Sequence, residues 1–203
     1  MKIAIVNEKG GSGKTTLALN IAAGITNAVL YDLDPQASAT AWKALSTVQW
    51  TIDNKQDGKD LIAEIKPLKN VVIDCPPGLQ NMATAAALAV CDIALIPITP
   101  SGADIMAAGR MIGLIKHTQR ERKGLPIAAI VPNRVDMRTG SGRSILDDLA
   151  PFELPVLPMI RSRMAFADSF AAHQWIGDYA KNSPAHKEIM ELIKCLRNLT
   201  IKT

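Results

Sequence analysis

The chain has 203 residues, of which 48% are hydrophobic and 4% aromatic, and it carries a formal net charge of +4. This length suits one α/β domain, residues 1–203, with a large core, and the mild basic excess can attract polyanions. No stretch has the length and purity of a transmembrane helix, Met1 leads directly into an apolar run, and three cysteines form no paired framework. These features argue against a membrane-spanning or secreted protein, and we expect a cytoplasmic one.

Apolar runs and helical patterns alternate along the chain. The runs predict strands at 2–6, 28–31, 71–73, 93–96 and 127–131, with a short sixth strand at 155–157. Helical periodicity predicts helices at 15–26, 37–46, 80–90, 103–121, 142–149, 164–172 and 185–199. The polar region 47–59 is expected to be a surface excursion. This alternation predicts a doubly wound, mainly parallel sheet flanked by helices, with ligands at the carboxyl ends of its strands.

Residues 7–16, NEKGGSGKTT, lie between the first predicted strand and the first predicted helix and have the pattern of a phosphate-binding loop (P-loop). The N–H groups at a helix N-terminus bind phosphates, and glycines at 10, 11 and 13 let the backbone approach them. Lys14 is placed to reach the β- and γ-phosphates of a nucleoside triphosphate, and Thr15 to ligate Mg²⁺. The order strand, loop, helix disfavours the alternative of a glycine turn that binds nothing.

Carboxylates follow the second and third predicted strands. Asp32 and Asp34 come after the strand at 28–31, and Asp74 ends the run at 71–73. An apolar run that ends in aspartate is the Walker B arrangement, which holds Mg²⁺ directly or through water. A single aspartate at such a position is more often a helix cap or a turn former. Three of them beside a P-loop favour a metal–nucleotide site.

Lys9 lies five residues before Lys14, and local phosphate binding leaves it unexplained. With Lys9 included, residues 9–15 have the pattern K-G-G-x-G-K-[ST]. In this the chain resembles the ParA/MinD group of deviant P-loop ATPases, which carry a signature lysine at the position of Lys9. That resemblance implies ATP and Mg²⁺ as cofactors and a homodimer that forms on ATP, in which Lys9 reaches the partner's phosphates. It assigns nucleotide contacts to the whole loop: Lys9, Gly10, Gly11, Ser12, Gly13, Lys14, Thr15 and Thr16. The alternative is a solvated loop lysine.

The resemblance extends over most of the chain. The D-L-D-P-Q segment at 32–36 is similar to the family's second acidic motif, which implies that Asp34 positions the attacking water and Asp32 supports the metal shell. Asn133 is similar to the residue that contacts the base. The stretch after D-P-Q, up to Trp42, looks like the small ParF-type members. These likenesses imply a DNA partition ATPase with slow hydrolysis that a centromere-binding, ParB-like partner stimulates.

Basic residues gather at several places in the sequence. The resemblance implies non-specific DNA binding by the ATP dimer, and hence a nucleoid-associated protein, although solvated helix faces are the alternative. The expected DNA contacts are Arg161, Arg163, Lys187 and Lys194. A further basic group lies on or after the helix predicted at 103–121: Arg110, Lys116, Arg120, Arg122 and Lys123.

Two other functions remain open from the sequence. A MinD-like membrane ATPase would need a detachable amphipathic tail, and residues 188–199 do carry apolar residues at helical spacing. Such a stripe is more often core packing, so no membrane partner is expected. The other alternative is an ATP-dependent ligase of the dethiobiotin-synthetase type, which would have no need of Lys9.

Overall fold

The computed structural model describes residues 1–46, 51–54 and 60–201. Its strands form one parallel sheet in the order β3-β2-β4-β1-β5-β6. They are β1 (Lys2–Ile5), β2 (Val29–Asp32), β3 (Thr51–Asn54), β4 (Val71–Asp74), β5 (Ile93–Ile98) and β6 (Ile127–Pro132). The chain therefore winds outward from β1 to β3, returns to β4 and then crosses β1 to reach β5 and β6, which confirms the predicted doubly wound fold.

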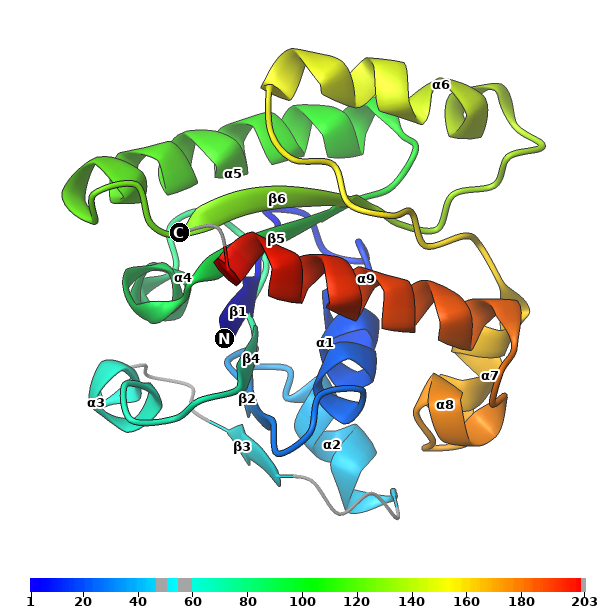
Figure 1. Cartoon of the computed structure of the whole chain (residues 1–203), viewed down its shortest axis with the longest axis horizontal. Coiled ribbons are helices and arrows are strands. Elements are labelled where there is room, and N and C mark those ends of the chain that lie inside the picture. Colours follow the sequence, from blue (N-terminus) through cyan, green and yellow to red (C-terminus); the bar gives the residue numbers. More distant parts are fainter. Residues whose placement is uncertain (47–50, 55–59, 202–203) are drawn as a thin grey trace.

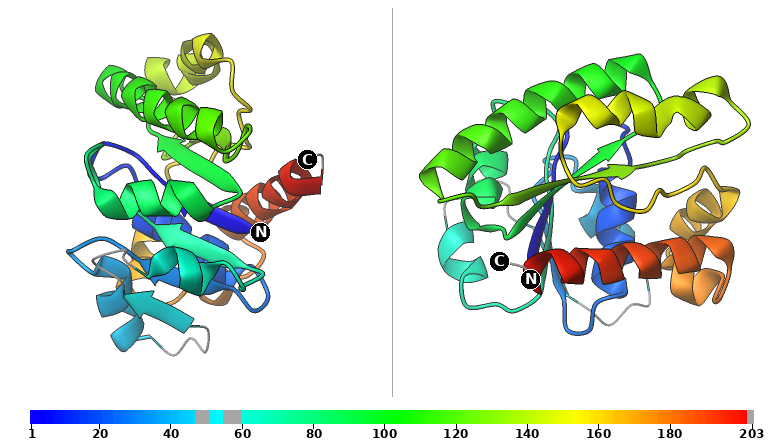
Figure 2. Two further views of the ribbon diagram at one scale, coloured as in Figure 1. Left: turned by 90° about the vertical axis from the view of Figure 1, so that its left-hand side faces the viewer. Right: turned by 45° about the horizontal axis from the view of Figure 1, so that its top comes forward.

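Helices cover both faces of this sheet (Figures 1 and 2). One face carries α1 (Lys14–Ala23), α2 (Ser38–Ala44), α7 (Met164–Ala171), α8 (Ile176–Tyr179) and α9 (Pro184–Ile201). The other carries α3 (Leu61–Ile65), α4 (Met82–Val90), α5 (Gly102–Glu121) and α6 (Gly140–Leu149). Strand side chains alternate between these two layers: Ile3 and Ile5 of β1 pack toward α1, whereas Ala4 packs toward α4 and α5.

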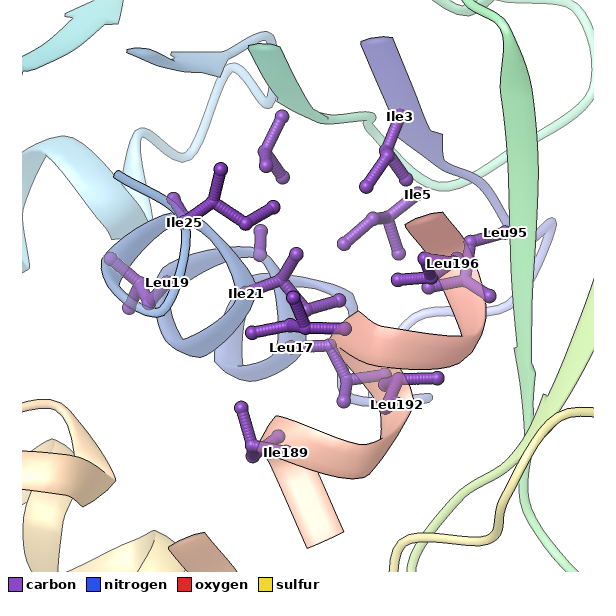
Figure 3. Packing of buried hydrophobic residues seen from close by; sticks show 14 of the residues in the cluster. Ile3, Ile5, Leu17, Leu19, Ile21, Ile25, Leu95, Ile189, Leu192 and Leu196 are labelled. Atoms are coloured by element: carbon purple, nitrogen blue, oxygen red, sulfur yellow. The ribbon is translucent and has the colours of Figure 1, made fainter. Parts of the chain in front are cut away.

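The α9 helix packs its apolar stripe into the core. Ile189, Leu192 and Leu196 are buried, and they lie beside Leu17 and Ile21 of α1 (Figure 3). The stripe at 188–199 is therefore core packing, which was the favoured interpretation of its spacing. Within the described part of the chain, no helix combines the length and the apolar character needed to cross a membrane.

Three sequence predictions need correction. The short strand expected at 155–157 is only an isolated bridge between Val156 and Ile130. The region 47–59 was expected to be a surface excursion, but residues 51–54 form the edge strand β3, and the remainder lies outside the described residues. The short helices α3 and α8 were not predicted. Both consist of five residues or fewer, too short for helical periodicity to be recognised.

Arg122 is half-buried and binds another helix instead of forming part of a basic surface. One terminal nitrogen of its guanidinium donates to the carbonyl oxygens of Leu88 and Cys91, each at 2.7 Å. These carbonyls lie at the C-terminal end of α4, where backbone acceptors have no partner within the helix. This residue thus ties the end of α4 to the end of α5.

We expect Arg122→Ala to lower the free energy of unfolding by about 1–3 kcal/mol, because two carbonyl groups lose their donor. Urea denaturation measures the change. Arg120, an exposed residue of α5, provides the control, and Arg120→Ala should change stability by less than about 0.5 kcal/mol. Equal losses in the two variants would refute a stabilising role for the Arg122 hydrogen bonds.

Candidate functional site

A cavity of about 730 Å³ lies at the carboxyl ends of the strands, and its volume is within the usual range for a small-ligand site. The P-loop and the first turn of α1 form one part of its wall. The segment that leads into α7, together with α7, forms another part. Its glycine and polar lining residues are Gly10, Gly11, Gly13, Lys14, Thr15, Thr16, Asp34, Gln36, Ser38, Asn133, Arg134, Arg161, Ser162 and Arg163.

The P-loop delivers an open helix N-terminus to this cavity. Gly13, the residue before α1, has a φ of 89°, a left-handed conformation that favours glycine. Among the described residues, no side chain caps the start of α1. The first-turn N–H groups and the positive end of the helix dipole are therefore available to an anion such as a phosphate.

Two residues that follow β6 hold the P-loop from the side. The side-chain amide of Asn133 donates to the carbonyl oxygen of Ser12 at 2.8 Å, and Arg134 donates to that of Gly11 at 2.9 Å. A Cβ added to Gly13 would lie 2.4 Å from the amide nitrogen of Asn133. Glycine at position 13 therefore serves close packing as well as backbone conformation. The base contact expected for Asn133 stays a prediction.

The Lys14 ammonium lies inside the loop. It donates to the carbonyl oxygen of Lys9 at 3.1 Å, and only 6% of the residue is exposed. Burial lowers the pKa of Lys14, and the nearby carboxylates of Asp74 and Asp34 oppose that effect. A buried ammonium that has one neutral oxygen as its hydrogen-bond acceptor is well placed to exchange it for a phosphate oxygen.

Asp74 lies next to this lysine with its carboxylate buried. Neither of its oxygens has a hydrogen-bond partner of good geometry among the described residues. Burial raises the pKa of Asp74 to about 7, while the hydroxyl of Thr15 and the charge of Lys14 counteract part of the rise. An orphaned carboxylate beside a threonine hydroxyl is the donor set that Mg²⁺ uses in P-loop sites. The residues present therefore fit Mg²⁺ together with a nucleotide.

Thr15 and Asp74 would supply the protein ligands of Mg²⁺. No cluster of three or more His, Cys, Asp or Glu side chains suited to a metal occurs in residues 1–46, 51–54 and 60–201. Mg²⁺ is commonly held in this manner, by one or two protein groups plus phosphate oxygens.

Asp32 and Asp34 have different environments. Asp32 is fully buried, pairs in register with Asp74, and accepts hydrogen bonds from the backbone N–H and the hydroxyl of Thr40, both at 2.9 Å. Asp34 is half-buried, lines the cavity and accepts a hydrogen bond from the N–H of Gln36 at 2.9 Å. Asp32 thus holds the loop between β2 and α2 in place through its hydrogen bonds with Thr40, whereas Asp34 lies at the cavity wall.

Lys9 is not among the residues that line this cavity. Its ammonium forms an ion pair with Asp104 in the first turn of α5. The preceding residue, Glu8, forms a bidentate pair with Arg110 of α5, with N···O distances of 2.6 and 3.0 Å. Two successive charged residues of the P-loop are therefore tied to one helix, outside the cavity that Lys14 serves.

The four expected DNA contacts lie in two different places. Arg161 and Arg163 line the nucleotide-sized cavity, and the Arg163 guanidinium is paired with Glu188 at 2.6 Å. Lys187 and Lys194 are exposed on α9, two turns apart on the same side of the helix. The two pairs therefore lie in different parts of the molecule, and DNA contact by all four residues stays a prediction.

The helices α2 and α7 are joined beside the cavity. The indole nitrogen of Trp42 donates to the carbonyl oxygen of Phe170 at 2.9 Å, and the two rings have centroids 6.3 Å apart. Phe170 also lines the cavity. The loop that carries Asp34 leads directly into α2, so this contact links that loop to the wall formed by α7.

Most of the predicted nucleotide-binding residues meet at this edge of the sheet. Ser12 is buried behind the loop, and Asp32 and Asp74 lie beneath the lining. Sequence reasoning missed Thr40, Asp104 and Arg134. Their partners are 8, 95 and 123 residues away in the sequence, so no local spacing could reveal them, although the adjacency of Arg134 to Asn133 was a usable signal.

Comparison with known proteins places this site in a family. Residues 3–176 match the family model of the CobQ/CobB/MinD/ParA nucleotide binding domain. The chain is 31% identical over 178 residues to the "Maintenance of carboxysome distribution protein A" of Halothiobacillus neapolitanus, covering 82% of each protein. It is 24% identical over 200 residues to the "Sporulation initiation inhibitor protein Soj" of Bacillus subtilis, covering 74% of this chain and 79% of the relative.

A solved structure agrees in fold. A chain of the "MinC:MinD cell division protein complex" from Aquifex aeolicus matches with a TM-score of 0.79 at 20% identity, covering 97% of this chain and 95% of that one. Because the family model spans most of the chain and the strand, loop and carboxylates have the geometry of a nucleotide site, the chain belongs to the ParA/MinD family of P-loop, nucleotide-binding ATPases.

Proposed function

We propose that this protein is a partition ATPase that closes into a dimer on Mg-ATP, holds DNA without sequence preference, and positions a cargo through a partner protein. The observation that carries the proposal is the placement of two lysines on one loop. Lys14 lies inside the cavity, whereas the Lys9 side chain is 46% exposed and lies outside it. A lysine so placed can serve the nucleotide of a second subunit.

Different residues of one chain would bind the triphosphate, the metal ion and the attacking water. Lys14, the glycines and the open end of α1 would hold the triphosphate. Thr15 and Asp74 would hold Mg²⁺, which neutralises phosphate charge when bound. Asp32, which is held in place by hydrogen bonds from Thr40, would support that metal shell. Asp34 would orient the attacking water. Slow turnover that the partner stimulates then requires that Asp34, or Lys9 of the second subunit, reach its working position only in the complex.

Exposed apolar side chains near Lys9 also favour docking of a second copy. Met106 is 70% exposed and lies on α5 between Asp104 and Arg110, the partners of Lys9 and Glu8. Met82 is 81% exposed at the start of α4, and the loop before it bonds to the P-loop through the N–H of Gly78 and the carbonyl of Glu8 at 2.8 Å. Large apolar side chains exposed beside a functional charge are typical of contact surfaces.

Lys9→Ala tests the proposal. The variant should bind ATP with an affinity close to that of the wild type and yet remain monomeric in Mg-ATP, because the contact made by Lys9 exists only in the dimer. Multi-angle light scattering in ATP, ADP and no nucleotide measures the mass. Lys116→Ala, at an exposed lysine further along α5, is the matched control and should dimerise normally. If Lys9→Ala dimerised as the wild type does, the lysine would be only a local loop residue.

The DNA-binding part of the proposal rests on α9. Lys187 and Lys194 are exposed on the side of α9 opposite the stripe that packs into the core, and Arg197 is exposed at the flank of that stripe. A dimer would present two such helices, which doubles the phosphate contacts that one DNA duplex can make. This placement supports α9 as the DNA-binding element and nucleoid association as the location.

Wild-type protein should bind random duplex DNA more tightly in ATP than in ADP, with a steep log-linear salt dependence. The double variant Lys187→Ala/Lys194→Ala should lower the salt slope by about two per subunit and leave ATP affinity unchanged. Arg161→Ala is the matched comparison, and because Arg161 lines the cavity it should alter ATP affinity instead. Salt titrations of fluorescent DNA in both nucleotides decide this. Identical binding curves in ATP, ADP and no nucleotide would contradict the partition function and favour the alternative of an ATP-dependent ligase.

The relatives narrow the cargo and its partner protein to two classes. The relative from Halothiobacillus is named for carboxysome distribution, so the cargo of this chain is either a DNA molecule, recognised through a ParB-like protein, or a protein compartment with its own adaptor. The membrane alternative loses support, because the apolar stripe of α9 is buried.

A further inference from the structure

We infer that Asp104 is a positioning residue that competes with the second subunit for Lys9. This inference rests on the proposed role of Lys9 across the dimer interface. Asp104 of the same chain holds the Lys9 ammonium against α5, and dimerisation on ATP requires that this ion pair open. The strength of the pair then sets how much ATP is needed to form the dimer.

The geometry of Asp104 suits such a competition. One carboxylate oxygen pairs with the ammonium of Lys9, and the other accepts a hydrogen bond from the hydroxyl of Thr99. The Asp104 side chain is 5% exposed, whereas that of Lys9 is 46% exposed. The carboxylate is therefore fixed in the protein, and the lysine is the partner that is free to move.

Asp104 can release the lysine without becoming an uncompensated buried charge. It keeps the hydroxyl of Thr99, and it lies in the first turn of α5, where the helix dipole stabilises a negative charge. Both contacts are independent of Lys9. An isolated buried carboxylate would make opening prohibitive, whereas this one makes it a modest and adjustable cost.

The neighbouring ion pair keeps the loop in place while the lysine moves. Glu8 stays bound to Arg110 through two hydrogen bonds, and the carbonyl of Glu8 accepts the N–H of Gly78. The first contact anchors the backbone beside Lys9 to α5, and the second anchors it to the loop before α4. Opening of the Lys9–Asp104 pair is therefore a side-chain rearrangement that leaves the phosphate-binding backbone unchanged.

The test compares two substitutions that should act in opposite directions. Asp104→Asn removes the charge with little change of shape, so more of the protein has a free Lys9, and half-maximal dimerisation should need roughly tenfold less ATP. Thr99→Val removes the hydroxyl that compensates Asp104, so the carboxylate depends more on Lys9, and dimerisation should need more ATP. Light scattering over an ATP titration measures both, and a fluorescent ATP analogue measures affinity in the dilute monomer, which should not change.

The outcomes separate this inference from the proposed function. Lys9→Ala/Asp104→Asn should stay monomeric like Lys9→Ala, because the released lysine is the group that acts. If Lys9→Ala is monomeric but Asp104→Asn matches the wild type or dimerises less readily, competition is refuted and the proposed function stands. If Lys9→Ala dimerises normally, the proposed function itself fails. Loss of dimerisation in both Asp104→Asn and Thr99→Val would indicate a purely structural role for Asp104.

Discussion

Replacing Lys14 with alanine will weaken ATP binding by on the order of 10²-fold or more, whereas Asp34→Ala will keep ATP affinity and lose turnover. The Lys14 ammonium is buried inside the loop, so its removal takes from the triphosphate a cation that solvent cannot replace. Asp34 lines the cavity, and among the hydrogen bonds of the described residues its side chain accepts only from the N–H of Gln36 in the same loop. Its loss should leave the loop and the phosphate contacts intact.

Isothermal titration with a non-hydrolysable analogue and a phosphate-release assay measure the two effects separately. Asp34→Asn keeps the side-chain oxygen that accepts from Gln36, so it controls for changes in the loop. Asp34→Asn should therefore bind ATP normally and hydrolyse it poorly. Equal losses of ATP affinity in Lys14→Ala and Asp34→Ala would contradict the role given to Asp34.

Asp74→Asn should have opposite effects on stability and on catalysis. Burial raises the pKa of Asp74 to about 7, against about 3.9 for an exposed aspartate, so the native state binds a proton that the unfolded state releases between these values. Stability of the metal-free protein should therefore fall as the pH rises from about 4 to about 7, and stay level above that. Asparagine removes this penalty and also removes the metal ligand.

At pH 8 in EDTA, Asp74→Asn should be more stable than the wild type by on the order of 2–4 kcal/mol, and at pH 4 this advantage should vanish. In Mg-ATP its hydrolysis should fall by on the order of 10²-fold or more. Urea denaturation of both proteins at the two pH values measures the effect of Asp74 together with its coupling to Lys14, because titrating groups that do not interact with Asp74 cancel in the difference. A variant that is stabilised equally at both pH values, or that hydrolyses ATP normally, would contradict the assignment.

The sequence predicted the elements that have strong local patterns and missed those that depend on tertiary contacts. Strands such as β1 and β5 are apolar on both faces because helices cover both sides of the sheet. The edge strand β3 contains a single apolar residue, Ile52, and forms because β2 offers it a partner. Its residues carry no periodic signal that distinguishes them from a surface loop.

The candidate site shows the same division. The P-loop and the strand-terminal aspartates have fixed local spacing, so they could be recognised one by one. Asp104 could not, because its role depends on α5 lying against a loop 95 residues earlier in the chain. Arg122 was wrongly grouped with surface charges for the same reason, since a sequence does not reveal that a neighbouring helix ends beside it.

The contact between Trp42 and Phe170 has a consequence for how product leaves. It fastens the wall formed by α7 to the helix that follows Asp34, while Asn133 and Arg134 fasten the loop after β6 to the P-loop. The cavity wall thus has two parts: Trp42 joins one of them by a hydrogen bond to a backbone carbonyl, and Asn133 and Arg134 join the other by two such bonds. We expect the exchange of ADP for ATP to proceed by separation of these two parts of the cavity wall. The hydrogen bonds within each part should stay intact, and the sheet beneath should not rearrange.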